Sequence, residues 1–283
     1  MADSNYTIRT MTRTEIDLAV EWAAAEGWNP GLYDADCFHA ADPNGFLIGL
    51  LGDEPVATIS VVKYGASFGF LGFYIVKPEY RGRGYGLQLW QAGMASLEGR
   101  NVGLDGVTAQ QENYKKSGFT WAYANIRYEG QGLGESPTDP DLIPLVARPF
   151  DELRAYDAPF FPEDRSRLLE CWIAQPEGAA LGILHNGKLA GYGVVRPCRS
   201  GYKIGPLFAD TAAFAERLFL ALGGNVPVSA PLFLDVPSVN PAAVALAERY
   251  KMLPVFETAR MYTRQAPDLP MEQLFGVTTF ELG

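Results

Sequence analysis

The residues best suited to chemistry form a glycine-rich segment between an expected strand and an expected helix. The segment reads Val76-Lys77-Pro78-Glu79-Tyr80-Arg81-Gly82-Arg83-Gly84-Tyr85-Gly86. Glycine lets the backbone approach an anion closely, and successive amide N–H groups can turn inward at the positive end of a helix dipole. The segment therefore predicts a binding site for a diphosphate group.

Two other phosphate-binding motifs compete for this segment. A Rossmann dinucleotide fold begins with its glycine motif and alternates strands with helices, whereas here a helix and an antiparallel-looking hairpin come first. The lysine signature of the P-loop is also missing. Neither motif explains the segment.

Two ordered motifs resemble those of the GNAT (Gcn5-related) N-acetyltransferases. Arg81 to Gly86 fits the cofactor loop Arg/Gln-x-x-Gly-x-Gly/Ala, and Tyr114 to Phe119 fits a later Tyr-x-Lys-x-Gly-Phe segment. The resemblance covers roughly Tyr6 to Tyr128. It implies transfer of the acetyl group of acetyl-coenzyme A (acetyl-CoA) to a primary amine of a small molecule, by direct attack through a tetrahedral intermediate. A non-catalytic acyl-CoA sensor or interaction module, and an acetyltransferase of protein lysines or N-termini, remain as alternatives.

The resemblance also implies roles for individual residues. Backbone groups of Ile75 and Val76 would pair with the pantetheine arm and polarise the acetyl carbonyl. Tyr114 would protonate the departing thiolate, and this role is favoured over that of an ordinary packed tyrosine. The diphosphate would be held by Arg81, Gly82, Arg83, Gly84, Tyr85 and Gly86.

The residue that takes the proton from the amine is not evident. Many GNAT enzymes place a carboxylate on a strand about eleven residues before the loop arginine, but this chain has Phe70 there, in an aromatic strand. Glu26, beside an expected acceptor pocket, and Asp105, on the strand before Tyr114, are the candidates. Each could equally be a structural or solvated carboxylate.

An aromatic and acidic segment follows Glu26 and could cradle a cationic amine, although core packing and helix capping are the simpler interpretation. Its members are Trp28, Tyr33, Asp34, Asp36 and Phe38. His39 and His185 lie in different halves of the chain, so neither a metal site nor a histidine-dependent triad is expected.

Hydrophobic periodicity supplies the elements that would position these residues. Thr12 and Glu15 form a capping box before a helix that ends near Gly27. Apolar residues at helical spacing, among them Leu87 and Trp90, predict the helix that follows the glycine loop. Strands are expected at 6–11, 46–51, 56–63, 68–76, 102–107 and 121–128, and a short helix at 110–117.

The second half of the chain repeats the first. Lys63 matches Arg196, Tyr114 matches Ala247 and Arg127 matches Arg260 at one displacement of 133 positions. With a Gly- and Pro-rich linker at 130–140, this predicts an α/β protein with mixed sheets and two tandem GNAT acyl-CoA N-acyltransferase folds: a catalytic domain at 1–132 and a degenerate one at 141–283.

The same displacement predicts that the second copy is silent. It places Phe214 to Phe219, which contain no glycine, opposite the cofactor loop, and it replaces Tyr114 with Ala247. The closing segment, Leu274 to Leu282, is expected to add a strand.

The composition is globular and acidic, with 48% hydrophobic residues and a formal net charge of −10. The charge argues against nucleic-acid binding and favours a cationic amine as substrate. The three cysteines indicate neither a disulfide framework nor a zinc site. With no apolar run of about 20 residues, the sequence predicts no membrane span and a cytoplasmic protein. Oligomeric state, including a homodimer, stays open.

Overall fold

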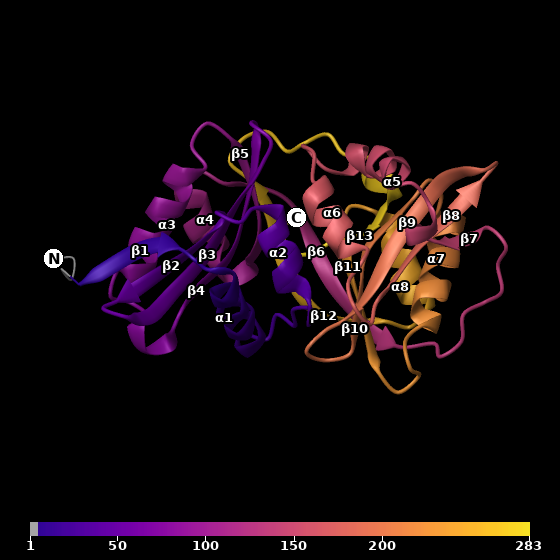
Figure 1. Cartoon of the computed structure of the whole chain (residues 1–283), viewed down its shortest axis with the longest axis horizontal. Coiled ribbons are helices and arrows are strands. Elements are labelled where there is room, and N and C mark those ends of the chain that lie inside the picture. Colours follow the sequence, from indigo (N-terminus) through magenta and orange to yellow (C-terminus); the bar gives the residue numbers. More distant parts are fainter. Residues whose placement is uncertain (1–4) are drawn as a thin grey trace.

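The computed structural model describes residues 5–283, in which thirteen strands form one mixed sheet. Figure 1 shows the two halves of the chain side by side, with the C-terminal segment returning to the middle. The first half contains β1 (Tyr6–Thr10), α1 (Arg13–Ala25), α2 (Asp34–Ala41), β2 (Phe46–Leu51), β3 (Glu54–Tyr64), β4 (Phe68–Val76), α3 (Tyr85–Ser96), β5 (Asn101–Val107), α4 (Gln111–Lys116) and β6 (Thr120–Gln131).

The second half repeats this element order, which confirms the tandem fold. The strands follow the order β1-β2-β3-β4-β5-β12-β6-β11-β10-β9-β8-β7. Two strands at the same distance from opposite edges of the sheet are therefore equivalent strands of the two halves. The second half contains β7 (Leu142–Pro144), α5 (Phe150–Asp157), α6 (Ser166–Trp172), β8 (Ala179–His185), β9 (Lys188–Pro197), β10 (Tyr202–Ala209), α7 (Ala212–Gly224), β11 (Pro231–Pro237), α8 (Pro241–Arg249), β12 (Leu253–Tyr262) and β13 (Leu274–Gly276).

The two halves exchange their last long strands. β6 pairs with β11 of the second half, and β12 pairs with β5 of the first half; the exchanged strands also pair with each other. The sheet therefore runs without interruption through both halves. A division at 1–132 and 141–283 stays a prediction about the chain, because neither segment alone contains all the strands that its sheet uses.

Two buried ion pairs fix this exchange. Arg127 on β6 donates to both carboxylate oxygens of Asp235 on β11, at 2.7 and 2.8 Å. Arg260 on β12 donates likewise to Asp105 on β5, at 2.9 and 2.6 Å. Burial alone would lower the pKa of each guanidinium, but the facing aspartate raises it, so both arginines stay charged.

The helices α1 and α3 follow the apolar spacing read from the sequence. Thr12 and Glu15 form the capping box, and the buried side of α1 carries Ile16, Ala19, Val20 and Ala23. In α3, Leu89, Trp90 and Gly93 are buried, whereas Leu87 is 60% exposed. Leu87 and Trp90 share a face of the helix, and this face borders a groove between α3 and α4.

The cysteines also differ from expectation, because Cys37 and Cys171 form a disulfide. They lie on α2 and α6, equivalent helices of the two halves that pack together, and their Cα atoms are 5.2 Å apart. Cys198 is free and buried. No local pattern predicts this bond, because its partners are 134 positions apart and meet only when the halves associate.

Reduction of this bond should destabilise the protein. The disulfide closes a long loop and limits the conformational freedom of the unfolded chain, so its loss should cost about 2–5 kcal/mol of unfolding free energy. Denaturant titrations with and without a phosphine reductant measure the difference. Cys198→Ala should show the same difference, whereas Cys37→Ser should show none. Three titratable thiols in the denatured, unreduced wild type would contradict the assignment.

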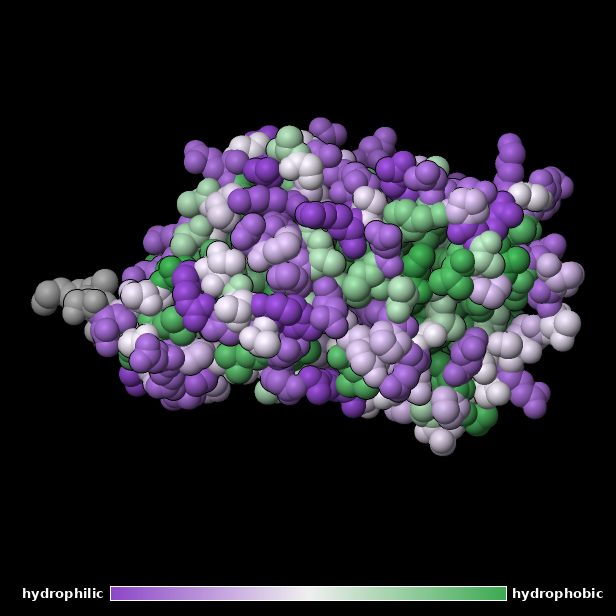
Figure 2. All heavy atoms as spheres, viewed as in Figure 1, coloured by the Kyte–Doolittle hydropathy of each residue, from purple (hydrophilic) through white to green (hydrophobic). Residues whose placement is uncertain are grey.

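The surface in Figure 2 is polar over most of the face in view, and apolar side chains gather over the second half. Exposed large apolar residues of that half include Val146, Val228 and Leu253. Among residues 5–283, no helix has the length and apolar character that crossing a membrane requires.

Candidate active site

β4 and β5 separate part-way along their length, which opens the sheet. They pair in parallel only from Phe68 to Leu71 on β4, although both strands continue further. Beyond that point β4 carries a bulge, where Phe73 adopts a φ of 46°. A non-glycine residue in this region is strained, so the surrounding sheet must hold it there. The bulge turns the end of β4 away from β5.

A cavity of about 340 Å³ lies in this opening, and both halves of the chain line it. It brings together most of the residues singled out from the sequence. From the first half they are Glu26, Trp28, Ile75, Val76, Arg81, Asp105 and Tyr114. The second half contributes Phe256, Thr258, Phe280 and Glu281.

A second cavity, of about 680 Å³, lies between α3 and α4. Leu87, Trp90 and Met94 give it an apolar wall. It shares Tyr74 and Tyr114 with the first cavity. The two therefore adjoin, forming a cleft that runs from the α3–α4 groove into the opened sheet.

The glycine loop has the backbone expected of an anion site at two of its three glycines. Gly82 and Gly84 have φ values of 75° and 88°, and a side chain on either would meet open space. Among residues 5–283, the amides of Gly82, Arg83 and Gly84 have no hydrogen-bond partner. Gly84 is also the N-cap of α3. Unpaired amides at a helix N-terminus favour an anion.

Gly86 serves a different purpose from the one expected. It lies inside α3, where a Cβ would stand 2.7 Å from both Tyr74 Oη and Val76 Cγ2. Its lack of a side chain lets α3 pack closely against β4.

The charged and aromatic residues of the loop hold it in place. Arg81 Nε donates to the carbonyl of Val76 at 2.8 Å, and Arg81 Nη2 donates to Glu26 at 2.5 Å. The Arg83 guanidinium lies 5.4 Å from the ring centre of Tyr80, and the Tyr85 ring packs against Tyr6. These contacts tie both ends of the loop to the sheet.

Tyr114 lies where the two cavities meet. Its ring stacks on Trp90 at 5.7 Å and packs so closely on β5 that Gly106 has no room for a side chain. Burial raises the pKa of Tyr114 to about 12, so the phenol keeps its proton at neutral pH. In the described part of the chain its hydroxyl makes no hydrogen bond that would occupy it.

The two carboxylates expected to be candidate bases are both held by arginines. The side chain of Asp105 is buried, pairs with Arg260, and accepts a further hydrogen bond from Asn125 at 2.8 Å. Glu26 is partly exposed and pairs with Arg81. Both line the cavity, but each already neutralises a cation.

The aromatic and acidic cradle does not form. Asp34 is buried in an ion pair with Arg196, and Phe38 lies in the core. Tyr33 bonds Glu177 at the surface, and only Trp28 lines the cavity. Between residues 5 and 283, no three His, Cys, Asp or Glu side chains are grouped to hold a metal ion.

The second half lacks an equivalent cofactor loop, although not for the reason expected. β10 ends at Ala209 and α7 begins at Ala212, so the loop is deleted rather than replaced, and Phe214 to Phe219 belong to α7. β13 pairs with β10 beyond the point where β10 leaves β11. The opening that forms the cavity in the first half is therefore filled in the second.

The loss of Tyr114 in the second copy follows the expected register. Phe119 N donates to Tyr114 O at 3.2 Å, and Met252 N donates to Ala247 O at 3.0 Å, in equivalent turns. Ala247 therefore occupies the position of Tyr114.

The closing segment departs most from expectation. Only Leu274–Gly276 is a strand, and residues 277–283 continue without regular structure into the middle of the molecule. This path carries Glu281 to the cavity, where it is 4% exposed. No motif in the sequence marks this residue.

Comparisons with known proteins agree with this geometry. The family described as "Acetyltransferase (GNAT) family" matches residues 11–119, and "Acetyltransferase (GNAT) domain" matches residues 153–276. The chain belongs to the GNAT superfamily and is a tandem acyltransferase. It is 32% identical over 279 residues to the holothin acyltransferase of Pseudoalteromonas sp., covering 98% of this chain and 95% of that protein.

Solved structures share the fold. A putative acetyltransferase from Pyrococcus horikoshii superposes with a TM-score of 0.84 at 23% identity, covering 100% of this chain and 98% of the other. A tandem GNAT protein from the clavulanic acid biosynthesis pathway has a TM-score of 0.63 at 13% identity, covering 93% and 100%.

Proposed function

We propose that this chain transfers the acetyl group of acetyl-CoA to a primary amine of a small molecule. The observation that carries the proposal is the cleft, which both halves wall and which Arg81, the residue before the unpaired amides of Gly82 to Gly84, lines. A diphosphate on Gly82 to Gly84 and a pantetheine arm in the α3–α4 groove would fit this shape. The fit rests on unpaired amides and an apolar wall.

The roles of the individual residues follow from their places in the cleft. Within the loop from Arg81 to Gly86, the unpaired amides of Gly82 to Gly84 bind the diphosphate, and backbone groups at Ile75 and Val76 orient the acetyl carbonyl. The amine nitrogen bonds to the carbonyl carbon, and the carbon–sulfur bond breaks. Tyr114 gives its proton to the departing sulfur. Asp105 supports the sheet, and Glu26 holds Arg81.

A small acceptor is favoured over a protein one. The cavity has a volume of about 340 Å³, and Trp28 and Phe280 wall it from opposite halves, whereas a protein lysine needs an open groove. Thr258 Oγ1 is buried in this cavity without a partner among the described residues, so a polar acceptor group would satisfy it. The relative named as a holothin acyltransferase supports a small acceptor.

Replacement of Tyr114 tests the proposal. Tyr114→Phe should lower kcat by about a hundredfold, at the low end for general acids because a thiolate leaves readily. The affinity for CoA should change little. Thiol release from acetyl-CoA with a panel of primary amines measures turnover, and calorimetry measures binding.

The matched control is Tyr250→Phe, which removes a hydroxyl bonded to Glu216 outside the cleft. It should leave turnover unchanged. If the wild type binds CoA but turns over none of the amines, the chain is a sensor and the proposed function is wrong.

A further inference from the structure

This inference rests on the proposed function and concerns the residue that takes the proton from the amine. Phe70 occupies the strand position where the resemblance implies a carboxylate. Of the three carboxylates that line the cavity, Glu26 and Asp105 are paired with arginines. Glu281 is the third, and it makes no ion pair with any residue in 5–283.

The C-terminal segment lies against β4 just where the strand lacks a carboxylate. A Cβ on Gly72 would collide with the carbonyl oxygen of Glu281, and one on Gly283 would stand 2.9 Å from the Phe70 ring. The segment therefore covers β4 from Phe70 to Gly72, next to the bulge at Phe73. The C-terminal segment that lies on β4 therefore provides a carboxylate, that of Glu281, where the strand itself has none.

The path of the segment is fixed at its other end. Val277 N donates to the carbonyl of Asp235 at 2.9 Å, and a Cβ on Gly205 would stand 2.5 Å from Val277 O. Gly205 on β10 is the repeat equivalent of Gly72 on β4. The segment is thus held at equivalent points of both halves, and Glu281 cannot move far from the cavity.

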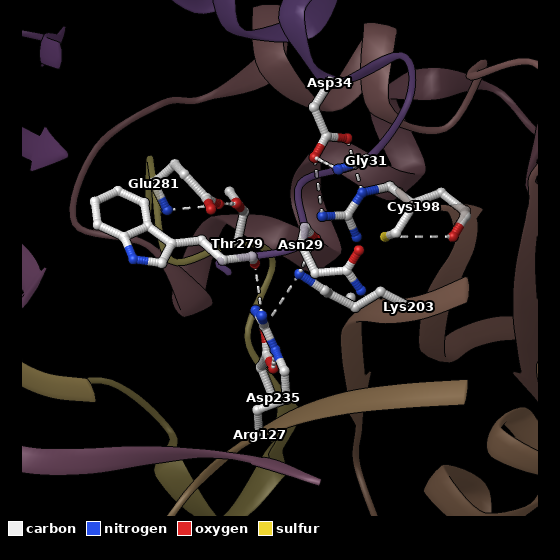
Figure 3. Close-up of polar contacts among 12 residues, drawn as sticks. Asn29, Gly31, Asp34, Arg127, Cys198, Lys203, Asp235, Thr279 and Glu281 are labelled. Carbon is white, nitrogen blue, oxygen red and sulfur yellow. Dashed lines mark hydrogen bonds and ion pairs between the residues drawn. The ribbon is translucent and has the colours of Figure 1, made fainter. Parts of the chain in front are cut away.

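Glu281 lies within electrostatic reach of several buried cations. Figure 3 shows it beside a buried cluster in which Arg127 pairs with Asp235 and Lys203 lies close by. Arg196 also acts on Glu281 and is itself neutralised by Asp34. Cys198 lies in the same cluster and is uncharged, since burial raises the pKa of its thiol.

Lys203 is the third cation near Glu281, but it donates to the carbonyl of Asn29 at 3.0 Å and lies 3.9 Å from Asp235, so it does not pair with Glu281. Burial, followed by Arg127, lowers the pKa of Lys203. Thr279 Oγ1 donates to one carboxylate oxygen of Glu281. The other oxygen accepts no hydrogen bond within the described chain, so it is available to a ligand in the cavity.

We propose that Glu281 is the general base of acetyl transfer. Its carboxylate takes one proton from the ammonium form of the substrate, which frees the nitrogen lone pair to attack the carbonyl carbon as the carbon–sulfur bond breaks. Tyr114 protonates the departing sulfur and regains a proton that the nitrogen releases through water, and Glu281 gives its own proton to water. The second half, which binds no cofactor of its own in this scheme, thereby supplies a catalytic residue to the first.

Glu281→Gln tests this assignment in the full chain. With an alkyl amine and acetyl-CoA, kcat/KM should fall about a hundredfold at pH 7. Activity should recover as the pH approaches the pKa of the amine, because solvent then removes the proton. With an aromatic amine, which is already neutral at pH 7, kcat/KM should fall much less. Affinity for CoA should stay unchanged.

Two further variants separate catalysis from structure. Glu281→Asp keeps the charge but withdraws the carboxylate, so it should lose activity while its thermal midpoint matches the wild type. Glu272→Gln makes the same chemical change at an exposed position of the same segment and should have no effect.

Each outcome has a definite consequence. If the wild type turns over and Glu281→Gln is fully active, the inference is wrong but the proposed function stands. The same holds if a higher pH does not restore the activity of Glu281→Gln, or if Glu281→Asp is as active as the wild type. Absence of wild-type turnover overturns the proposed function, and the inference with it.

Discussion

Gly84→Glu should weaken the binding of CoA by about a hundredfold to a thousandfold while the protein stays folded. The new carboxylate would stand about 4 Å from the diphosphate, where repulsion costs about 3–4 kcal/mol near a protein surface. The positive φ of Gly84 adds backbone strain. Calorimetric titration with CoA measures the loss.

Two variants separate charge from strain. Gly84→Ala adds strain alone and should lose less affinity than Gly84→Glu. Gly99→Glu places the same side chain at a φ of 84° in an exposed turn with equally open surroundings, so it should bind normally. Unchanged affinity in a folded Gly84→Glu protein would show that the diphosphate binds elsewhere.

Asp105→Ala should lower the unfolding free energy by about 3–5 kcal/mol. The substitution leaves Arg260, which is 6% exposed, with no counter-charge, and an unpaired buried charge is costly. It also weakens the contact between β5 and β12 that joins the halves. Urea denaturation followed by circular dichroism measures the change.

The matched control is Asp17→Ala, which breaks an exposed pair with Arg13 on α1. Exposed pairs contribute about 1 kcal/mol or less. If Asp105→Ala costs no more than this control, the buried pair does not hold the exchanged strand. A catalytic role for Asp105 would instead predict lost activity at unchanged stability.

Most of the correct predictions about the first half came from local motifs. The loop from Arg81 to Gly86 and the turn after Tyr114 depend on backbone conformations that neighbouring residues encode, so their types and spacing were informative. The same holds for the capping box at Thr12. Periodicity located the strands, since burial on one or both faces marks each of them.

The features that sequence reasoning missed depend on contacts between distant parts of the chain. The Cys37–Cys171 bond, the pairing of Asp105 with Arg260, and the position of Glu281 arise only once the halves pack together. Alignment at one fixed displacement also misplaced Phe214 to Phe219, because it could not allow for the deleted loop. A single sequence contains no local signal for any of these.

The exchanged strands set an order of events during synthesis. β6 leaves the ribosome before the second half, whose sheet it later joins, has been made. The sheet of the first half stays open until β12 has been translated. Until then, β5 presents an unpaired edge that another nascent chain could occupy. Closure of the sheet in the first half thus depends on translation of the second half as far as β12, and products truncated before β12 should aggregate rather than fold.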